Sequence, residues 1–226
     1  MCSRYNLTVQ VEAVRAYFQV EKGEPYPPRY NIAPSQPVLI LRLDHARERE
    51  LALVRWGLIP SWAKDPARLS NLFNARAESA TEKASFRGAM RHRRCLVPAN
   101  GFYEWTGKAG ARQPHLIRRP DSGLMAFAGL WESWLGADGS EIDTMAILTV
   151  AANSTLSSLH ERMPAILQPA DFDAWLDTRG FSAEMAAEML RPAPADLLEH
   201  VTVDPRLNNA RNEGPELIAP YRGTLL

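Results

Sequence analysis

The middle of the chain constrains the fold most, because it holds a nearly continuous series of strand-like segments. Five short segments there are rich in apolar and β-branched or aromatic residues, and glycine-rich turns follow the second and fourth of them. They lie at residues 95–97, 101–105, 115–118, 125–131 and 142–150. Strands joined by tight turns pair antiparallel. The region therefore predicts an antiparallel sheet that can close on itself.

Further elements are expected on both sides of this region. Strands are expected at 4–7, 38–43, 51–56 and 198–203. Short helices are expected near 154–160, 171–177 and 182–190. Thr8 is expected to cap a helix whose apolar residues have helical spacing and which ends before Gly23. The five prolines within 24–37 predict an extended, stiff loop.

Ser79 and Glu82 have the spacing of a capping box and predict a helix over roughly 80–91. Strands in successive hairpins with helices gathered elsewhere are typical of the α+β class. No low-complexity segment or long linker divides the 226 residues. We therefore expect a single domain over 1–226, with a mainly antiparallel, barrel-like sheet flanked by short helices.

Composition excludes several functional classes. The sequence has no run of about 18 apolar residues and no secretory signal, which predicts a cytoplasmic protein with reduced thiols at Cys2 and Cys95. Its five histidines are far apart, and it lacks CxxC, HExxH, P-loop, dinucleotide-glycine and GxSxG patterns, so we expect no metal and no cofactor.

Charge is distributed unevenly although the net charge is zero. Residues 1–150 hold 20 Lys and Arg against 15 Asp and Glu, and residues 151–226 compensate. A site for a polyanion must therefore be a local patch in the first two-thirds. The densest cluster is Arg87, Arg91, His92, Arg93 and Arg94. A solvated helix face is the alternative interpretation of this cluster.

Cys2 becomes the first residue if Met1 is removed. It then carries an α-amine and a thiol, with reference pKa values of about 7.7–8.0 and about 8.5, so both reach reactive forms near neutrality. Such a 1,2-aminothiol condenses with an aldehyde to an imine, and the thiol closes a five-membered thiazolidine. An internal cysteine has no amine to offer. The alternative is that a cysteine at this position is incidental.

Three polar residues are candidates for chemistry. Asn74, next to Arg76 at a predicted helix start, suits an anion site, although a capping asparagine has the same pattern. Glu104 lies between two aromatic residues of a strand and would suit acid–base work if it points inward, where burial raises a carboxyl pKa. His160 suits proton donation near neutrality, although a lone histidine is commonly structural.

Trp62 is one of six tryptophans, most of which should belong to the core. It lies in a predicted loop, two residues before Lys64. An aromatic ring beside a cation suits stacking of a nucleobase next to a phosphate contact.

Several segments together resemble the SRAP family, whose name stands for SOS-response-associated peptidase and whose members process abasic sites. The matching segments run in order along the chain: 1–5 (MCSRY), 29–34 (RYNIAP), 56–62 (WGLIPSW), 74–78 (NARAE), 94–105 (RCLVPANGFYEW), 127–131 (FAGLW) and 160–164 (HERMP). The match extends to about residue 168, and the helical part 169–226 is less diagnostic.

The resemblance implies an enzyme that binds abasic sites in single-stranded DNA. It implies that Cys2, after removal of Met1, captures the ring-opened sugar as a covalent thiazolidine crosslink and so shields the lesion in the DNA damage response. It also implies catalytic roles for Asn74, Glu104 and His160, and DNA contacts from Arg4, Arg76, Trp62 and Arg162. We expect a monomer that associates with the nucleoid when it is bound to DNA. Ser3 departs from the family, which usually has glycine there.

Two other classes of function remain open from the sequence. An N-terminal cysteine whose own amine acts as a base is also the arrangement of N-terminal-nucleophile amidohydrolases, and the family name includes a peptidase. Cleavage of a DNA strand, or of the chain's own initiator methionine, would be a related activity. A plain single-strand-binding module would bind DNA without any covalent product.

Overall fold

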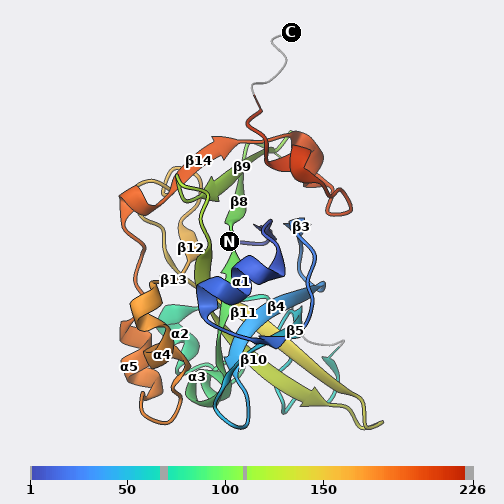
Figure 1. The fold of residues 1–226 in the computed structure, drawn as a ribbon, viewed down its shortest axis with the longest axis vertical. Coiled ribbons are helices and arrows are strands. Elements are labelled where there is room, and N and C mark those ends of the chain that lie inside the picture. Colours follow the sequence, from blue (N-terminus) through green and yellow to red (C-terminus); the bar gives the residue numbers. More distant parts are fainter. Residues whose placement is uncertain (1, 67–70, 109–110, 222–226) are drawn as a thin grey trace.

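Five strands close into a barrel in the computed structural model, which describes residues 2–66, 71–108 and 111–221 (Figure 1). In barrel order they are β11 (Glu141–Ala151), β10 (Met125–Leu135), β7 (Arg94–Ala99), β4 (Pro37–Leu43) and β5 (Arg49–Trp56). Neighbours along this path pair antiparallel. A parallel pairing of β5 with β11, at Arg55–Thr144 and Trp56–Met145, closes the ring. The predicted barrel-like sheet is confirmed.

Short strands extend the barrel. β6 (Asn74–Arg76) lies parallel to β11, and β12 (Arg162–Pro164) pairs antiparallel with it. β13 (Ile166–Leu167) pairs with β10, and β2 (Lys22–Gly23) pairs with β5. β6 and β12 therefore both end beside the same part of β11.

A second sheet of five strands covers the barrel. Its order is β14 (Glu199–Thr202), β9 (Gln113–Arg118), β8 (Gly101–Thr106), β1 (Tyr5–Leu7) and β3 (Arg29–Ile32). The chain passes from the barrel to this sheet at Asn100, between β7 and β8. Tyr5 packs edge-on against Trp56 and Phe127 of the barrel, so the two sheets share one hydrophobic core.

The helices are short. They are α1 (Val11–Phe18), α2 (Ala77–Ala80), α3 (Arg87–His92), α4 (Phe172–Leu176) and α5 (Ala183–Glu188). Single 3₁₀ turns occur at Pro169–Asp171, Ala195–Leu197, Pro205–Asn208 and Pro215–Ile218. Figure 1 shows α2 to α5 gathered on one side of the barrel. The expected α+β class with short flanking helices is confirmed.

Four local expectations were wrong. α1 begins after Gln10 without a side-chain cap, and the Thr8 N–H donates to the Asn100 side chain. The helix expected at 80–91 is two helices, because Ser79 lies inside α2 and its carbonyl accepts from Glu82 and Lys83 in a closing turn. Residues 154–159 form turns rather than a helix. The proline-rich stretch contains strand β3.

Candidate functional site

Cys2 lies at the entry to β1, the strand between β3 and β8. The Tyr103 N–H donates to the Arg4 carbonyl, which continues the pairing with β8 beyond β1 itself. Cys2 is fully buried, and its thiol points to the Arg4 carbonyl at 3.7 Å. Met1 lies outside the described residues. A cysteine at the second position is thus held in the interior of the fold.

Asn74 connects the barrel to this N-terminal segment. It lies on β6, opposite Ile147 of β11. Its Nδ2 donates to the Cys2 carbonyl at 2.6 Å. Its Oδ1 is buried and has no hydrogen-bond partner in the described part of the chain. A buried amide oxygen without a partner is unfavourable unless a ligand or water satisfies it. Asn74 therefore offers an acceptor next to Cys2.

Glu104 points inward from β8, and its exposed fraction is only 6%. This decides between the two orientations left open by the sequence. Burial raises the pKa of its carboxyl to about 7. Burial also raises the pKa of the Cys2 thiol, and the Glu104 carboxylate raises it further, which places the two groups within electrostatic reach. A carboxyl that titrates near neutrality can both give and take a proton.

His160 lies in the turn between β11 and β12. Its Nδ1 accepts the Arg162 N–H at 2.9 Å, so the neutral ring carries its proton on Nε2. Burial lowers the pKa of this half-buried imidazole. His160 is therefore held as a neutral Nε2–H donor.

Arg162 stabilises this turn through hydrogen bonds. Its guanidinium makes two bonds to the Glu78 carboxylate of α2, at 2.6 and 2.8 Å, and a third to the Thr149 carbonyl at 2.5 Å. The turn that holds His160 is thereby tied to the segment that follows Asn74. Arg162 is occupied by protein groups, and its contact with DNA stays a prediction.

The other expected DNA contacts differ in accessibility. Arg76 is 58% exposed, and the Glu161 carboxylate lies 4.0 Å from its guanidinium. Trp62 is 56% exposed, and its indole N–H donates to the Ala84 carbonyl. Arg4 is half-buried and donates to the Asn31 side chain at 2.6 Å and the Leu207 carbonyl at 3.1 Å.

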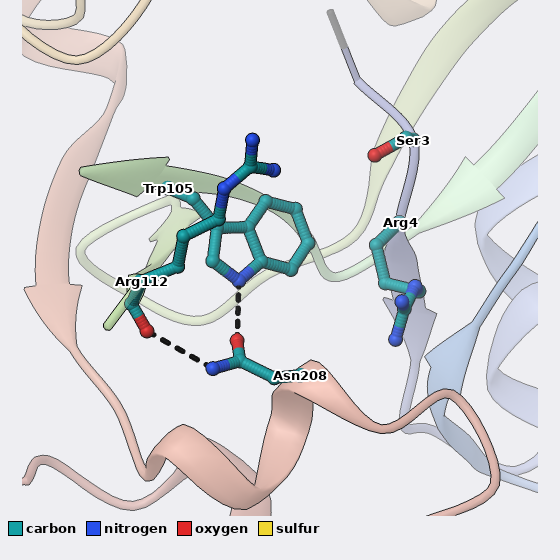
Figure 2. A pocket seen from close by; sticks show the side chains of 5 residues that line it. All are labelled: Ser3, Arg4, Trp105, Arg112 and Asn208. Carbon is teal, nitrogen blue, oxygen red and sulfur yellow. Dashed lines mark hydrogen bonds between the residues drawn. The ribbon is translucent and has the colours of Figure 1, made fainter. Parts of the chain in front are cut away.

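A pocket of about 380 Å³ opens beside Ser3 and Arg4. Figure 2 shows the Trp105 indole between Arg112 and Arg4, with Asn208 bonded to the indole N–H and to the Arg112 carbonyl. Arg4 approaches the ring face, with 5.7 Å from its Cζ to the ring centroid. Arg112 and Asn208 were not predicted from the sequence. Arg112 closely follows the 94–105 motif and folds back beside Trp105 through the β8–β9 hairpin, whereas Asn208 lies far from every motif and is brought there by the 205–208 turn.

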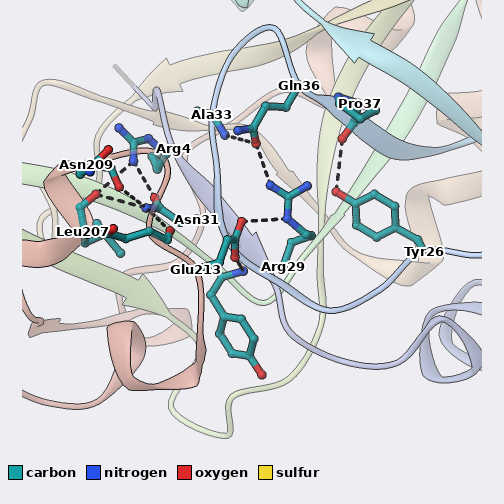
Figure 3. Close-up of polar contacts among 12 residues, drawn as sticks. Arg4, Tyr26, Arg29, Asn31, Ala33, Gln36, Pro37, Leu207, Asn209 and Glu213 are labelled. Carbon is teal, nitrogen blue, oxygen red and sulfur yellow. Dashed lines mark hydrogen bonds and ion pairs between the residues drawn. The ribbon is translucent and has the colours of Figure 1, made fainter.

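Asn31 fixes the C-terminal segment onto β3 (Figure 3). This buried amide donates to the carbonyls of Leu207, Asn209 and Asn212 at 2.9–3.3 Å, and its Oδ1 accepts from Arg4. Glu213 adds bonds to Arg29 and to the Tyr30 N–H. Sequence analysis missed Asn31, although a buried-strand asparagine flanked by tyrosine and isoleucine was the available signal.

The described residues hold no group of three or more histidine, cysteine or acidic side chains placed to bind a metal ion. No helix among them is long and apolar enough to cross a membrane.

Comparison with known proteins completes the description of the site. The family model of SOS response associated peptidase (SRAP) matches residues 1–210. The chain belongs to the SRAP family. The segment from Cys2 to Arg162, with all the residues described above as candidates for chemistry, falls inside the matched SRAP region.

The relatives of this SRAP chain have informative names. "Abasic site processing protein YoqW" from Bacillus subtilis (strain 168) is 37% identical, over 98% of this chain and the whole of the relative. "Abasic site processing protein HMCES" from Rattus norvegicus is 35% identical over 86% of this chain and 65% of the relative.

Solved structures support the SRAP fold. A crystal structure of a protein from Bacteroides thetaiotaomicron superposes with a TM-score of 0.86 at 24% identity, covering 97% of this chain and all of that one. A second, from Bordetella bronchiseptica, has a TM-score of 0.78 at 30% identity and covers 90% and 100%.

Proposed function

We propose that this protein processes abasic sites in single-stranded DNA by forming a thiazolidine through Cys2 after removal of Met1. One observation carries the proposal: the buried Cys2 segment is held by Asn74 beside a carboxyl, Glu104, whose pKa burial raises to about 7. The names of the relatives point to the same lesion. An abasic sugar supplies the aldehyde that a 1,2-aminothiol needs.

The first step is opening of the sugar, which exists mostly as a closed hemiacetal. The neutral Nε2–H of His160 is suited to donate a hydrogen bond to the ring oxygen as its bond to C1 breaks, while the proton of the C1 hydroxyl passes to that oxygen through solvent. This yields the C1 aldehyde and a free hydroxyl. The lowered pKa of His160 favours the neutral ring, which keeps its own proton and assists ring opening as a hydrogen-bond donor.

The second step joins protein and DNA. The Cys2 amine adds to C1 to form a carbinolamine, which loses water to become an imine. Glu104 is suited to carry the proton from the amine to the leaving hydroxyl. The thiol then adds to the imine carbon, and its proton moves to the nitrogen, which closes the thiazolidine. Asn74 Oδ1 is placed to accept a hydrogen bond from the amine or sugar.

This last addition also protects the strand. An imine at C1 promotes β-elimination of the neighbouring phosphate. Addition of the thiol consumes the imine and so prevents this elimination. We therefore propose that strand cleavage is a minor outcome for the intact enzyme and that the crosslink shields the lesion. Arg76 and Trp62 are the accessible groups for DNA contact, and we assign Arg4 and Arg162 supporting positions.

We further propose that residues 1–226 act as one domain and as a monomer in the cytoplasm, associated with DNA when a lesion is bound. The shared core of barrel and second sheet supports the single domain. The reaction as derived needs no cofactor.

A second candidate function is amide hydrolysis by the N-terminal cysteine, because the family name includes the word peptidase. The same amine would then activate the thiol against an amide carbonyl. The names of the relatives refer to abasic sites, which favours the first function over this alternative.

The deciding experiment uses Met1-processed protein and single-stranded DNA with one abasic site. We expect a denaturation-resistant complex whose mass equals the sum of both partners less one water. Protein that retains Met1, and the Cys2→Ala variant, should give no thiazolidine, whereas Cys95→Ala should crosslink normally. Equal crosslinking by Met1-retaining protein would rule out the mechanism, and release of amide products from a peptide substrate would favour hydrolysis.

A further inference from the structure

An exposed cavity of about 580 Å³ lies between the Trp62 loop and α3. Its lining residues are Trp62, Ala84, Arg87, Gly88, Arg91 and His92. α3 lies towards the opposite end of the molecule from β9 and β14 (Figure 1). The cavity is thus separate from the pocket beside Arg4.

The arginines of the basic cluster at residues 87–94 have two different roles in the structure. Arg93 pairs with the buried Glu132 carboxylate of β10. Arg94 is 2% exposed and donates to backbone carbonyls, including those of Met90 and Trp175. Both are therefore structural. Arg87 and Arg91 remain exposed, and no ion pair or side-chain hydrogen bond is formed by either among the described residues.

Arg87 and Arg91 are four residues apart on α3 and therefore lie on the same helix face. Glu184 of α5 is an acidic group within electrostatic reach, because Arg91 contributes a small part of the lowering of its pKa. Two cations with so little compensation create a local positive potential, although the whole chain is neutral.

The aromatic wall of the cavity is held in place. The Trp62 indole N–H donates to the Ala84 carbonyl, just before α3. On either side of Trp62, the Ile59 N–H donates to Thr144 Oγ1 and the Ala63 carbonyl accepts from Trp134. A large exposed ring held by one bond, on a loop held by two others, loses little conformational freedom when a flat ligand stacks on it.

We propose that Trp62, Arg87 and Arg91, here called the α3 platform, bind the single-stranded DNA that flanks the lesion. A nucleobase stacks on Trp62, and the adjoining phosphates contact the two guanidinium groups. This proposal rests on the proposed function for its ligand and for Trp62, and it adds Arg87 and Arg91 as phosphate contacts. The platform contributes affinity for DNA without taking part in the covalent steps.

The test measures binding of abasic single strands with long flanks, or with flanks cut back nearly to the lesion, to Met1-processed protein carrying Cys2→Ala. Arg87→Ala/Arg91→Ala should weaken binding of the long strand about 10-fold and reduce the slope of log affinity against log salt by about 1.4, or 0.7 for each lost phosphate contact. The short strand should bind equally to both proteins. Trp62→Phe should retain part of the affinity, and Trp62→Ala should lose more.

The matched control is Arg191→Ala/Arg211→Ala, which removes two exposed arginines elsewhere and should leave the slope unchanged. Unchanged affinity and slope for Arg87→Ala/Arg91→Ala would overturn the platform, as would weakening seen only with a duplex flank. Crosslinking of the short strand by protein with Cys2 intact tests the proposed function separately. Crosslinking without any flank effect would remove the platform alone, and a flank effect without crosslinking would remove the covalent mechanism alone.

Discussion

Glu104 makes the stability of the folded protein depend on pH. Its pKa is about 7 in the folded state against 4.5 for an ordinary glutamate, so the folded state binds more protons than the unfolded chain between these values. Stability therefore falls as pH rises from about 4.5 to about 7 and stays lower above that range. The penalty is that of ionising a buried carboxyl.

We predict that Glu104→Gln removes this dependence. Relative to the wild type, the variant should gain on the order of 3 kcal/mol of unfolding free energy on going from about pH 4 to about pH 8. Urea denaturation at both pH values measures the gain. Glu82→Gln, at an exposed position, is the control and should show no such gain. The same Glu104→Gln protein should crosslink abasic DNA roughly 10²–10⁴-fold more slowly, and a normal rate would remove Glu104 from proton transfer.

His160 should matter mainly where a closed sugar must be opened. We predict that His160→Ala slows crosslinking of abasic DNA by about 10²-fold or more but reacts nearly normally with a simple acyclic aldehyde. Single-turnover rates with both substrates measure the difference, and the exposed His45→Ala serves as the control. Equal defects on the two substrates would contradict this assignment.

The C-terminal segment helps to hold two secondary-structure elements, strands β1 and β3, in place. Asn31 bonds three carbonyls within 207–212 and at the same time holds the Arg4 guanidinium two residues from Cys2. The part of the chain that is least diagnostic in sequence thus helps to position the N-terminal segment.

We predict that Asn31→Ala lowers the unfolding free energy by roughly 2–4 kcal/mol, because it leaves buried carbonyls without donors and frees Arg4. Asn31→Asp keeps the acceptor for Arg4 but loses the donor to the carbonyls. Hydrogen exchange should therefore accelerate at 205–212 in both variants, whereas crosslinking should fall further in the alanine variant. Unchanged exchange at 205–212 would show that Asn31 does not hold this segment.

The site depends on the whole molecule, because its residues come from both sheets. Cys2 and Glu104 belong to the second sheet, whereas Asn74 lies on a strand added to the barrel and His160 lies in a turn after β11. Closure of the barrel through β5 and β11 brings the loop of Trp62 and the strand of Asn74 to the same strand, β11. A ligand that contacts Cys2 together with Asn74 therefore contacts both layers.

Local sequence patterns alone determined the strands of the middle region, their hairpin connections and the α+β class. These features depend on side-chain alternation and turn chemistry, which act over a few residues. The chemistry available to an N-terminal cysteine is likewise a property of one residue and its position.

The tertiary structure alone decided which way Glu104 points, that Arg93 and Arg94 are structural, and that the expected helix at 80–91 breaks into two. It also decided the parallel closure of β5 on β11 and the seat of the C-terminal segment on Asn31. In each case the outcome depends on which remote groups are buried together. Burial and hydrogen bonding between segments far apart in the chain leave little trace in the local pattern of either one.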